Sequence, residues 1–393
     1  MLIEHPFFQR LRRIHQLGLT NYVYPGANHT RFQHTLGTGH LMWQAVQVIR
    51  SKGHTITDEE AESVISAILL HDIGHGPFSH SLENSIIENT SHEELSLLFM
   101  NYLNKIMDGK LDMAIHIFKN EYPKKFLHQL VTGQLDMDRL DYLKRDSFFT
   151  GVTEGVIGSD RIIKMLNVKD DNLVVDNKGI YSVEKFLVAR RLMYWQVYLH
   201  KTVLSAENLL INILRRAKSL ALSGSQLAAS PALAFFLENY TDRSEIVSGD
   251  TEKFLNTFSQ LDDYDIIWAA KNWTDHEDFI LSTLCKNLIN RQLYSIELQS
   301  SPISGERIKE LETGIKNIYR IREEDLHYFL PRGEISNNAY NSNDEKIRIL
   351  QKNGNLKDIS QASDIFDFTA LSKTVKKYYI CFPKELKKAG KYG

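Results

Sequence analysis

The sequence is poor in cysteine and lacks both an excess of one charge and long apolar runs. Its two cysteines, Cys285 and Cys381, lie far apart, which excludes a paired metal-binding spacing and suits a reducing compartment. No run approaches the ~18 apolar residues that a transmembrane helix needs. Glu4 and Pro6 do not fit a secretory signal peptide. We therefore expect a cytoplasmic protein without a membrane partner.

Charge is balanced across the chain, with 47 lysine and arginine residues against 49 aspartate and glutamate residues. No overall field draws the protein to nucleic acid, so any attraction for a polyanion must be local. The 393 residues, of which 42% are hydrophobic, are enough to bury a large core.

The apolar pattern predicts a mainly α fold. Stripes at helical spacing predict helices over residues 34–50, 58–71, 92–107, 124–132, 136–148, 182–221, 231–240 and within 252–292. Alternating segments predict a β-hairpin over 172–182 with its turn at 177–179, and strands at 294–299, 328–330 and 378–382. Residues 333–345 are predicted to form a polar loop.

A serine-rich break at 222–225 divides this predicted fold. Residues 1–221 are expected to form a helical core that carries the small β-hairpin excursion. Residues 222–393 are expected to form a mixed α+β C-terminal region with an oligomerisation or accessory role.

Four scattered side chains could bind one metal ion. They are His34, the adjacent pair His71 and Asp72 after the apolar run 67–70, and Asp138. Two imidazoles and two carboxylates suit Mn, Fe, Co, Ni, Zn or Mg at a hydrolytic centre. The alternative is that each of these side chains has a structural role, either as a hydrogen-bonded group in the core or as a helix cap.

The segment after His71 is unusually rich in histidine. His71, His75 and His80 fall within ten residues, around a Gly-x-Gly-Pro break that separates two helices. His80 and Glu83 are three apart, so on a helix they share a face and can hydrogen-bond. A carboxylate behind an imidazole prepares a general acid or base. Alternatively, Glu83 is only a first-turn acid favoured by the helix dipole.

The order His34, His71-Asp72, Asp138 resembles the HD superfamily of metal-dependent phosphohydrolases. Three more stretches, 9–18, 24–37 and 136–146, resemble the deoxynucleoside triphosphate triphosphohydrolases, both bacterial dGTPase-like enzymes and the mammalian SAM- and HD-domain dNTPase. The resemblance runs from about Glu4 to about Asn208. It implies an HD-domain helical core and makes the four residues the metal ligands.

One predicted helix carries further polar side chains on the face of Asp138. Tyr142 and Asp146 follow it at intervals of four. Arg139 could meet a phosphate, and Asp146 could accept a sugar hydroxyl. The alternative is a charged surface helix, and to that view we assign the Asp141–Arg145 pair.

A second helical stripe combines two cations with two tyrosines: Arg190, Tyr194, Tyr198 and Lys201. Such a set suits a triphosphate and a nucleoside, although aromatic stripes are often core. In the family, a helix ending in Tyr-x-His-Lys has this role, and residues 198–201 match it. The resemblance places Arg190 at the γ-phosphate end and Arg31 at the α-phosphate. It places Gln16 and Leu17 around the base and sugar.

The resemblance implies hydrolysis of a dNTP to a deoxynucleoside and triphosphate. Metal-activated water would attack the α-phosphorus, and His80, oriented by Glu83, would protonate the leaving oxygen. His75 and His92 would bind the α-phosphate. Leu17 and Tyr142 would exclude a 2′-hydroxyl. The cations that would neutralise the phosphates are Arg31, Arg139, Arg190 and Lys201.

Two other classes of function remain as alternatives. One is another HD-type activity, such as a pyrophosphatase, a nucleotidase or a guanosine tetraphosphate hydrolase. The other is a non-catalytic nucleotide sensor.

The start of the chain departs from the family pattern. Relatives carry an Asp-Pro-rich segment that helps form an activating nucleotide site between subunits, and this chain starts at Met1 without it. This argues against activation by dGTP or GTP, although Arg10 and Arg12 remain for such a nucleotide activator. As in the family, we expect a homodimer or homotetramer.

Overall fold

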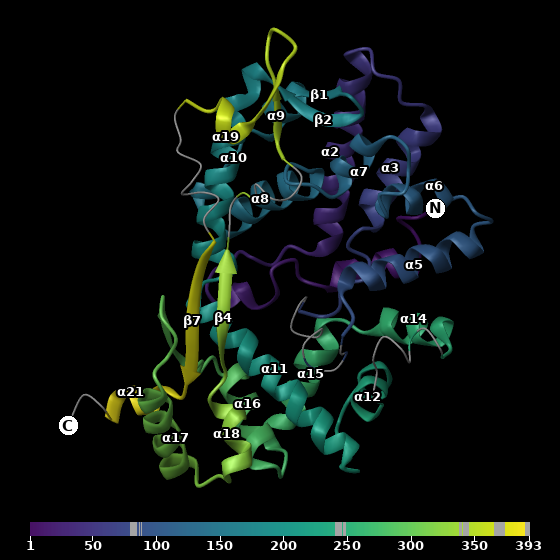
Figure 1. The fold of residues 1–393 in the computed structure, drawn as a ribbon. Helices are drawn as coiled ribbons and strands as arrows, with labels where there is room; N and C mark the ends of the chain where they lie inside the picture. Colours follow the sequence, from purple (N-terminus) through teal and green to yellow (C-terminus); the bar gives the residue numbers. More distant parts are fainter. Residues whose placement is uncertain are drawn as a thin grey trace.

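The computed structural model describes residues 1–78, 85, 87, 89–239, 246, 249–337, 340, 346–364 and 374–389. Its fold is mainly α with two small sheets (Figure 1). The longer helices are α2 (Arg31–Ser51), α3 (Asp58–Leu70), α5 (His92–Ile106), α8 (Met137–Thr150), α10 (Ile180–Met193), α11 (Lys201–Leu222), α14 (Thr251–Gln260), α15 (Asp263–Asn272), α16 (Phe279–Ile289) and α17 (Gly305–Tyr319). Shorter helices are α1 (Pro6–Gln9), α6 (Asp112–Phe118), α7 (Lys125–Val131), α9 (Ser159–Met165), α12 (Pro231–Glu238), α18 (Leu326–Phe329), α19 (Ile359–Ala362) and α21 (Lys384–Ala389).

Two sheets accompany the helices, and each combines distant parts of the sequence. The first has the order β1 (Leu166–Lys169), β2 (Asn172–Asp176), β5 (Arg348–Leu350) and β6 (Leu356–Asp358), with β2 and β5 parallel. The second is antiparallel, in the order β3 (Ser295–Gln299), β7 (Val375–Phe382) and β4 (Arg332–Asn337). The mainly α fold class with a mixed C-terminal region is therefore confirmed.

The β-hairpin exists, but the predicted turn position is wrong. Lys169 pairs with Asn172, so the two-residue turn is Asp170-Asp171, and both residues have positive φ angles of 51° and 59°. A tight hairpin turn of this kind needs positive φ at both central positions, which aspartate tolerates better than most residues. Residues 177–179 instead form a 3₁₀ turn that leads into α10.

The single helix predicted over 182–221 is interrupted. Helix α10 ends at Met193, one π-helical turn spans Tyr194–Tyr198, and α11 starts at Lys201. His200 caps α11, because its Nδ1 accepts a hydrogen bond from the Thr202 amide at 3.1 Å. Single π-helical turns are frequent at functional sites, and this one sets the direction of two tyrosines.

Two predictions in the C-terminal region are wrong. Residues 328–330 do not form a strand, because Leu326–Phe329 is helix α18. Residues 333–337, predicted as part of a polar loop, belong to edge strand β4. Polar residues are common on such an edge, where only the β7 side is paired, so composition alone misleads.

Two hydrophobic cores stabilise the molecule. One lies among α2, α3, α7, α8 and α10, and the other joins the N-terminal residues 7–19 to α11, α12, α14–α18 and β7. The second core therefore contains residues from both sides of position 221, and the division into two domains there stays a prediction. Trp273 belongs to this core at 1% exposure, whereas Trp268 is exposed.

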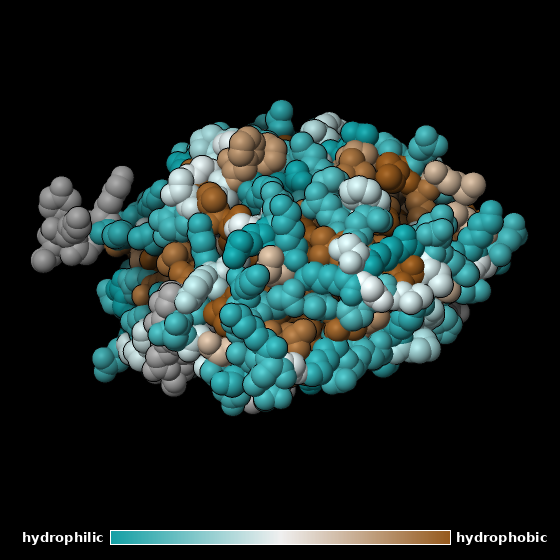
Figure 2. All heavy atoms as spheres, turned by 90° about the horizontal axis from the view of Figure 1, so that it is seen from above, coloured by the Kyte–Doolittle hydropathy of each residue, from teal (hydrophilic) through white to brown (hydrophobic). Residues whose placement is uncertain are grey.

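The surface fits the balanced composition. The face shown in Figure 2 is mainly hydrophilic, with hydrophobic side chains in small groups between polar ones. Among the described helices, none combines the length and apolar content of a membrane span.

The segment that follows α3 packs against α5 with almost no space between the two backbones. Gly74 donates its amide hydrogen to Ser96 Oγ at 2.9 Å, and that hydroxyl donates to the His71 carbonyl at 2.6 Å. A Cβ atom at Gly74 would lie 2.2 Å from the His92 carbonyl oxygen and 2.3 Å from the Ser96 nitrogen. Only glycine fits this contact.

We predict that Gly74→Ala lowers the free energy of unfolding by about 1–3 kcal/mol, since α5 must move to admit the methyl group. Gly305→Ala is the matched control, because nothing lies within 4 Å of a Cβ there. Urea unfolding followed by circular dichroism checks this. An unchanged midpoint for Gly74→Ala would contradict the close packing.

Candidate active site

The four predicted metal ligands come together in the structure. One ligand atom from each of His34, His71 and Asp72 lies within 4.8 Å of the others. Asp138 Oδ1 lies 3.0 Å from His34 Nε2 and 3.5 Å from His71 Nε2. Helix α2, the end of α3 and the first turn of α8 supply them.

Both imidazoles are held from behind so that Nε2 faces the cluster. His34 Nδ1 donates to Asp141 Oδ2 at 2.8 Å, and His71 Nδ1 donates to the Ile68 carbonyl at 2.6 Å. Among the described residues, no group meets either buried Nε2 atom with good hydrogen-bond geometry, although Asp138 Oδ1 lies 3.0 Å from the Nε2 of His34. Metal-binding histidines are oriented in this way, so the two nitrogens fit a metal site.

The electrostatics also favour a cation. Burial alone would lower the pKa of His34, but the Asp138 and Asp141 carboxylates raise it to about 10. Burial opposes ionisation of Asp138, yet the two imidazoles hold the pKa of its carboxyl group well below its usual range. A divalent ion would interact with the same carboxylates and displace protons from the imidazoles.

Arg31 lies beside the cluster. It is buried, and its Nη1 donates to Asp72 Oδ2 at 2.5 Å. The guanidinium group therefore balances part of the carboxylate charge.

Asp141 is a buried part of the site, and its assignment to a surface pair is wrong in that respect. The pair with Arg145 exists, with Nε and Nη2 each 2.8 Å from a carboxylate oxygen. However, Asp141 is only 6% exposed and also holds His34. A Cβ at Gly37 would lie 2.0 Å from Asp141 Oδ1, so glycine lets the carboxylate approach α2. An acid three residues after Asp138 was the available sequence signal.

His75 and His92 form a stacked pair next to the cluster. Their ring centroids are 3.9 Å apart at an angle of 15°. His75 Nε2 lies 3.3 Å from Asp72 Oδ1, while burial and the nearby Arg31 charge hold the pKa of His75 well below its usual value. His80 and Glu83, the predicted acid pair, lie outside the described residues.

A cavity of about 590 Å³ adjoins the cluster. Ten of the predicted site residues line it: Gln16, Leu17, Arg31, His92, Asp138, Arg139, Tyr142, Asp146, Tyr194 and Tyr198. Arg190 and Lys201 are outside the lining that the described residues form. The Arg190 guanidinium lies 5.8 Å from the Tyr194 ring centroid, and Lys201 is exposed at the start of α11.

Arg139 is fixed at the start of α8. Asp136 caps the helix by accepting the Arg139 amide hydrogen at 2.7 Å, and it also accepts from Arg139 Nε at 3.2 Å. The Arg139 side chain also donates to the Gly133 carbonyl at 2.6 Å. The cap thus determines where both Arg139 and the neighbouring Asp138 point.

Asp146 has protein partners of its own. It accepts from His29 Nε2 at 2.7 Å and from the Tyr198 hydroxyl at 2.8 Å. Each carboxylate oxygen has a second lone pair, so a sugar hydroxyl remains a prediction. Sequence reasoning missed His29, which is 1% exposed and stacks on Phe149.

The C-terminal region also lines the cavity, which the sequence did not indicate. Tyr379 of β7 lies in the lining beside Glu207 and Asn208 of α11, and its hydroxyl lies 3.3 Å from Asn208 Oδ1. Strand β7 therefore contributes one side chain to the cavity wall.

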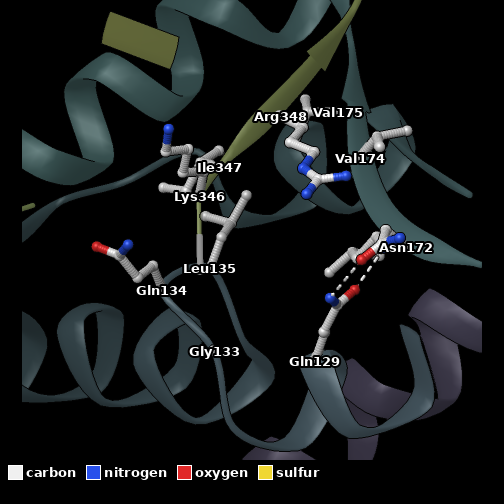
Figure 3. Close-up of a pocket in the computed structure, with 11 residues that line it drawn as sticks. Gln129, Gly133, Gln134, Leu135, Asn172, Val174, Val175, Lys346, Ile347 and Arg348 are labelled. Atoms are coloured by element: carbon white, nitrogen blue, oxygen red, sulfur yellow. Dashed lines mark hydrogen bonds between the residues drawn. The ribbon is translucent and has the colours of Figure 1, made fainter. Parts of the chain in front are cut away.

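A second cavity, of about 280 Å³, lies at the β2–β5 pairing (Figure 3). It shares no described lining residue with the first. On one side of it, Gln129 contacts β2, with Nε2 donating to Asn172 Oδ1 at 3.2 Å. None of the predicted site residues lines it, so we assign the chemistry to the cavity beside the cluster.

Comparison with known proteins identifies the family. Residues 31–144 match the HD domain, and residues 157–230 match the HD associated region. Protein YwfO of Bacillus subtilis is 32% identical over 96% of this chain and 87% of its own length. A crystal structure of a phosphohydrolase from Bacteroides thetaiotaomicron is 55% identical, with a TM-score of 0.93 over 97% of this chain and 94% of that one. The chain belongs to the HD-domain phosphohydrolases, which are metal-dependent.

A more distant relative carries a named activity. The deoxynucleoside triphosphate triphosphohydrolase SAMHD1 homolog of Dictyostelium discoideum is 31% identical. The match covers 57% of this chain and 47% of that protein.

We predict that Asp141→Asn weakens Mn²⁺ binding by about 10- to 100-fold, because a neutral amide replaces the carboxylate that orients His34 and raises its basicity. Asp160→Asn, an exposed acid in the first turn of α9, is the control and should bind as the wild type does. Calorimetric titration with Mn²⁺ measures both. Equal affinities in the two variants would show that Asp141 does not support the metal site.

Proposed function

We propose that the protein is a deoxynucleoside triphosphate triphosphohydrolase, which converts a dNTP and water into a deoxynucleoside and inorganic triphosphate. The observation that carries the proposal is that Asp138 belongs both to the metal-type cluster and to the wall of the large cavity, where Arg31, the partner of Asp72, also lies. A hydrolytic centre would thus open into a cavity large enough to hold a nucleotide. The likeness to the Dictyostelium SAMHD1 homolog supports the same activity.

His34, His71, Asp72 and Asp138 would hold a divalent ion, with Mn, Fe, Co, Ni, Zn and Mg as candidates. When bound, this ion would lower the pKa of a water molecule and make hydroxide available near neutral pH. The roles of the remaining residues follow from their positions around the cavity.

Phosphate recognition would begin at Arg31, which lies next to the cluster and suits the α-phosphate. Arg139 lines the same cavity and suits the next phosphates. Arg190 and Lys201 would have to reach the distal end from outside the lining, so they are the weaker members of this set.

The sugar and base would lie against Gln16, Leu17 and the tyrosines. Tyr142 and Tyr194 each contact Tyr198 edge to face, with ring centroids 5.9 Å and 5.1 Å apart. This aromatic wall, together with Leu17, would leave little room for a 2′-hydroxyl.

Cleavage of the bond between the α-phosphorus and the 5′-oxygen leaves an oxygen that needs a proton. His80, oriented by Glu83, is our candidate for this acid. His92 lines the cavity and His75 stacks on it, so both suit contact with the α-phosphate.

We further propose that residues 222–393 support a homo-oligomer.

The test is incubation of Mn²⁺-loaded protein with each dNTP and rNTP, followed by ³¹P NMR. We expect triphosphate from dNTPs. Pyrophosphate or orthophosphate would assign another HD-type activity, and no turnover with any metal or activator would favour a nucleotide sensor.

We also predict that Asp138→Ala loses both bound Mn²⁺ and turnover, because a ligand and a cavity wall are lost together. Lys144→Ala, an exposed change on the same helix, should retain both. Metal content by mass spectrometry and the same NMR assay check the pair. Full turnover in Asp138→Ala would contradict the assigned centre.

A further inference from the structure

The start of α15 contacts two segments that form the active-site wall. Asp263, the first residue of α15, is 2% exposed. Its Oδ1 accepts the Phe78 amide hydrogen at 2.8 Å. Its Oδ2 accepts from the His15 amide at 2.8 Å and from His15 Nδ1 at 2.6 Å. One buried carboxylate thus joins two segments that are far apart in the sequence.

Both segments lead directly into the site. His15 precedes Gln16 and Leu17, which line the cavity. Backbone hydrogen bonds continue this connection, because the Arg31 amide donates to the Ile14 carbonyl at 2.9 Å. Phe78 itself lines the cavity, six residues after Asp72.

The backbone of Phe78 needs such a contact. Its φ angle is 50°, in the left-handed region that a bulky residue rarely adopts. Such a conformation persists where the surroundings fix it. The hydrogen bond to Asp263 fixes the Phe78 nitrogen.

Arg10 holds the other end of the same loop. It is fully buried, and its Nη2 donates to the carbonyls of Ile73 at 2.8 Å and His75 at 2.9 Å. Its Nη1 lies 3.4 Å from the Leu261 carbonyl. Arg10 is therefore enclosed in the protein rather than open to a nucleotide activator, whereas Arg12 is exposed.

We propose that Asp263 is a positioning residue of the active site. It fixes Phe78 and His15 relative to each other, and with Arg10 it anchors the loop that follows Asp72 to Leu261 and Asp263. The C-terminal region thereby sets the geometry of a cavity that Asp263 itself does not line. The nature of the nucleotide rests on the proposed function, but the anchoring does not.

Asp263→Asn tests this with little change of shape. The carboxylate accepts from backbone amides at both oxygens, so either orientation of the new amide sets its NH₂ group against a backbone N–H. We expect about 10-fold faster hydrogen–deuterium exchange in peptides containing His15 and Phe78.

Asp262→Asn is the matched control. Asp262 loses the same charge next door, but its carboxylate pairs with the half-exposed Arg13 and caps α15 through the Tyr264 amide at 3.0 Å. Because Arg13 is close to His15 in the sequence, the control is read at the Phe78 peptide, where exchange should stay as in the wild type. Equal exchange of the Phe78 peptide in Asp263→Asn and Asp262→Asn would overturn the proposal.

Kinetics give a second readout. With any nucleotide that the wild type hydrolyses, Asp263→Asn should lower kcat/KM by about 10- to 100-fold, because the displaced cavity wall no longer orients the nucleotide, while the Mn²⁺ affinity stays unchanged. If the wild type hydrolyses no nucleotide, the proposed function fails and the exchange result alone decides on Asp263.

His15→Ala keeps the test decisive if Asp263→Asn does not fold, since it removes only the Nδ1 contact. A lower kcat/KM with unchanged Mn²⁺ affinity, or faster exchange in the His15 peptide, supports the proposal. Wild-type values of both would overturn it.

Discussion

The site depends on keeping two carboxylates and two imidazoles together inside the protein. Charged groups are costly to bury unless they are paired, and Asp72, His34 and Arg31 are all nearly inaccessible. The protein balances this charge with Arg31 and with protons on the imidazoles. A bound divalent ion would take the place of those protons, and the Nε2 atoms of both histidines face the position in the cluster that it would occupy.

Around this centre, the fold restricts each ligand from behind. Asp141 can reach His34 only because Gly37 has no side chain, and Ser96 can reach the His71 carbonyl only because α5 packs directly on Gly74. The same close fit extends to the C-terminal region, where Asp263 contacts a residue of the cavity wall and Tyr379 is itself part of that wall. Catalytic geometry of this kind needs a supporting layer of side chains that is itself immobile. The shared hydrophobic core that joins residues 7–19 to α11, α12 and α14–α18 provides it.

The sequence predicted the parts of this structure that depend on local pattern or on family motifs. Apolar stripes predicted helices α2, α3, α5, α7 and α8, because the spacing of apolar residues in a helix is visible within a short stretch of sequence. The four clustered ligands followed from the family resemblance, which assigns residues far apart in the sequence to one site. Residue spacing alone cannot do this.

What the sequence missed depends on contacts between distant residues or on unusual backbone geometry. Asp263 acts on residues 15 and 78, and nothing near position 263 indicates those partners. Asp141 looked like a surface residue because an i, i+4 partner was visible, while its contact across to α2 was not. The positive φ angles at Asp170 and Asp171 and the π-helical turn before His200 depend on backbone conformations that residue type favours only weakly.

The most direct measurement is anomalous X-ray diffraction from crystals grown with Mn²⁺. A peak within coordinating distance of His34 Nε2, His71 Nε2, Asp72 and Asp138 is the predicted result, with His34 Nδ1 still bound to Asp141. Absence of a peak there, with the imidazole nitrogens still held against the carboxylates, would contradict the assignment of this cluster as the metal centre.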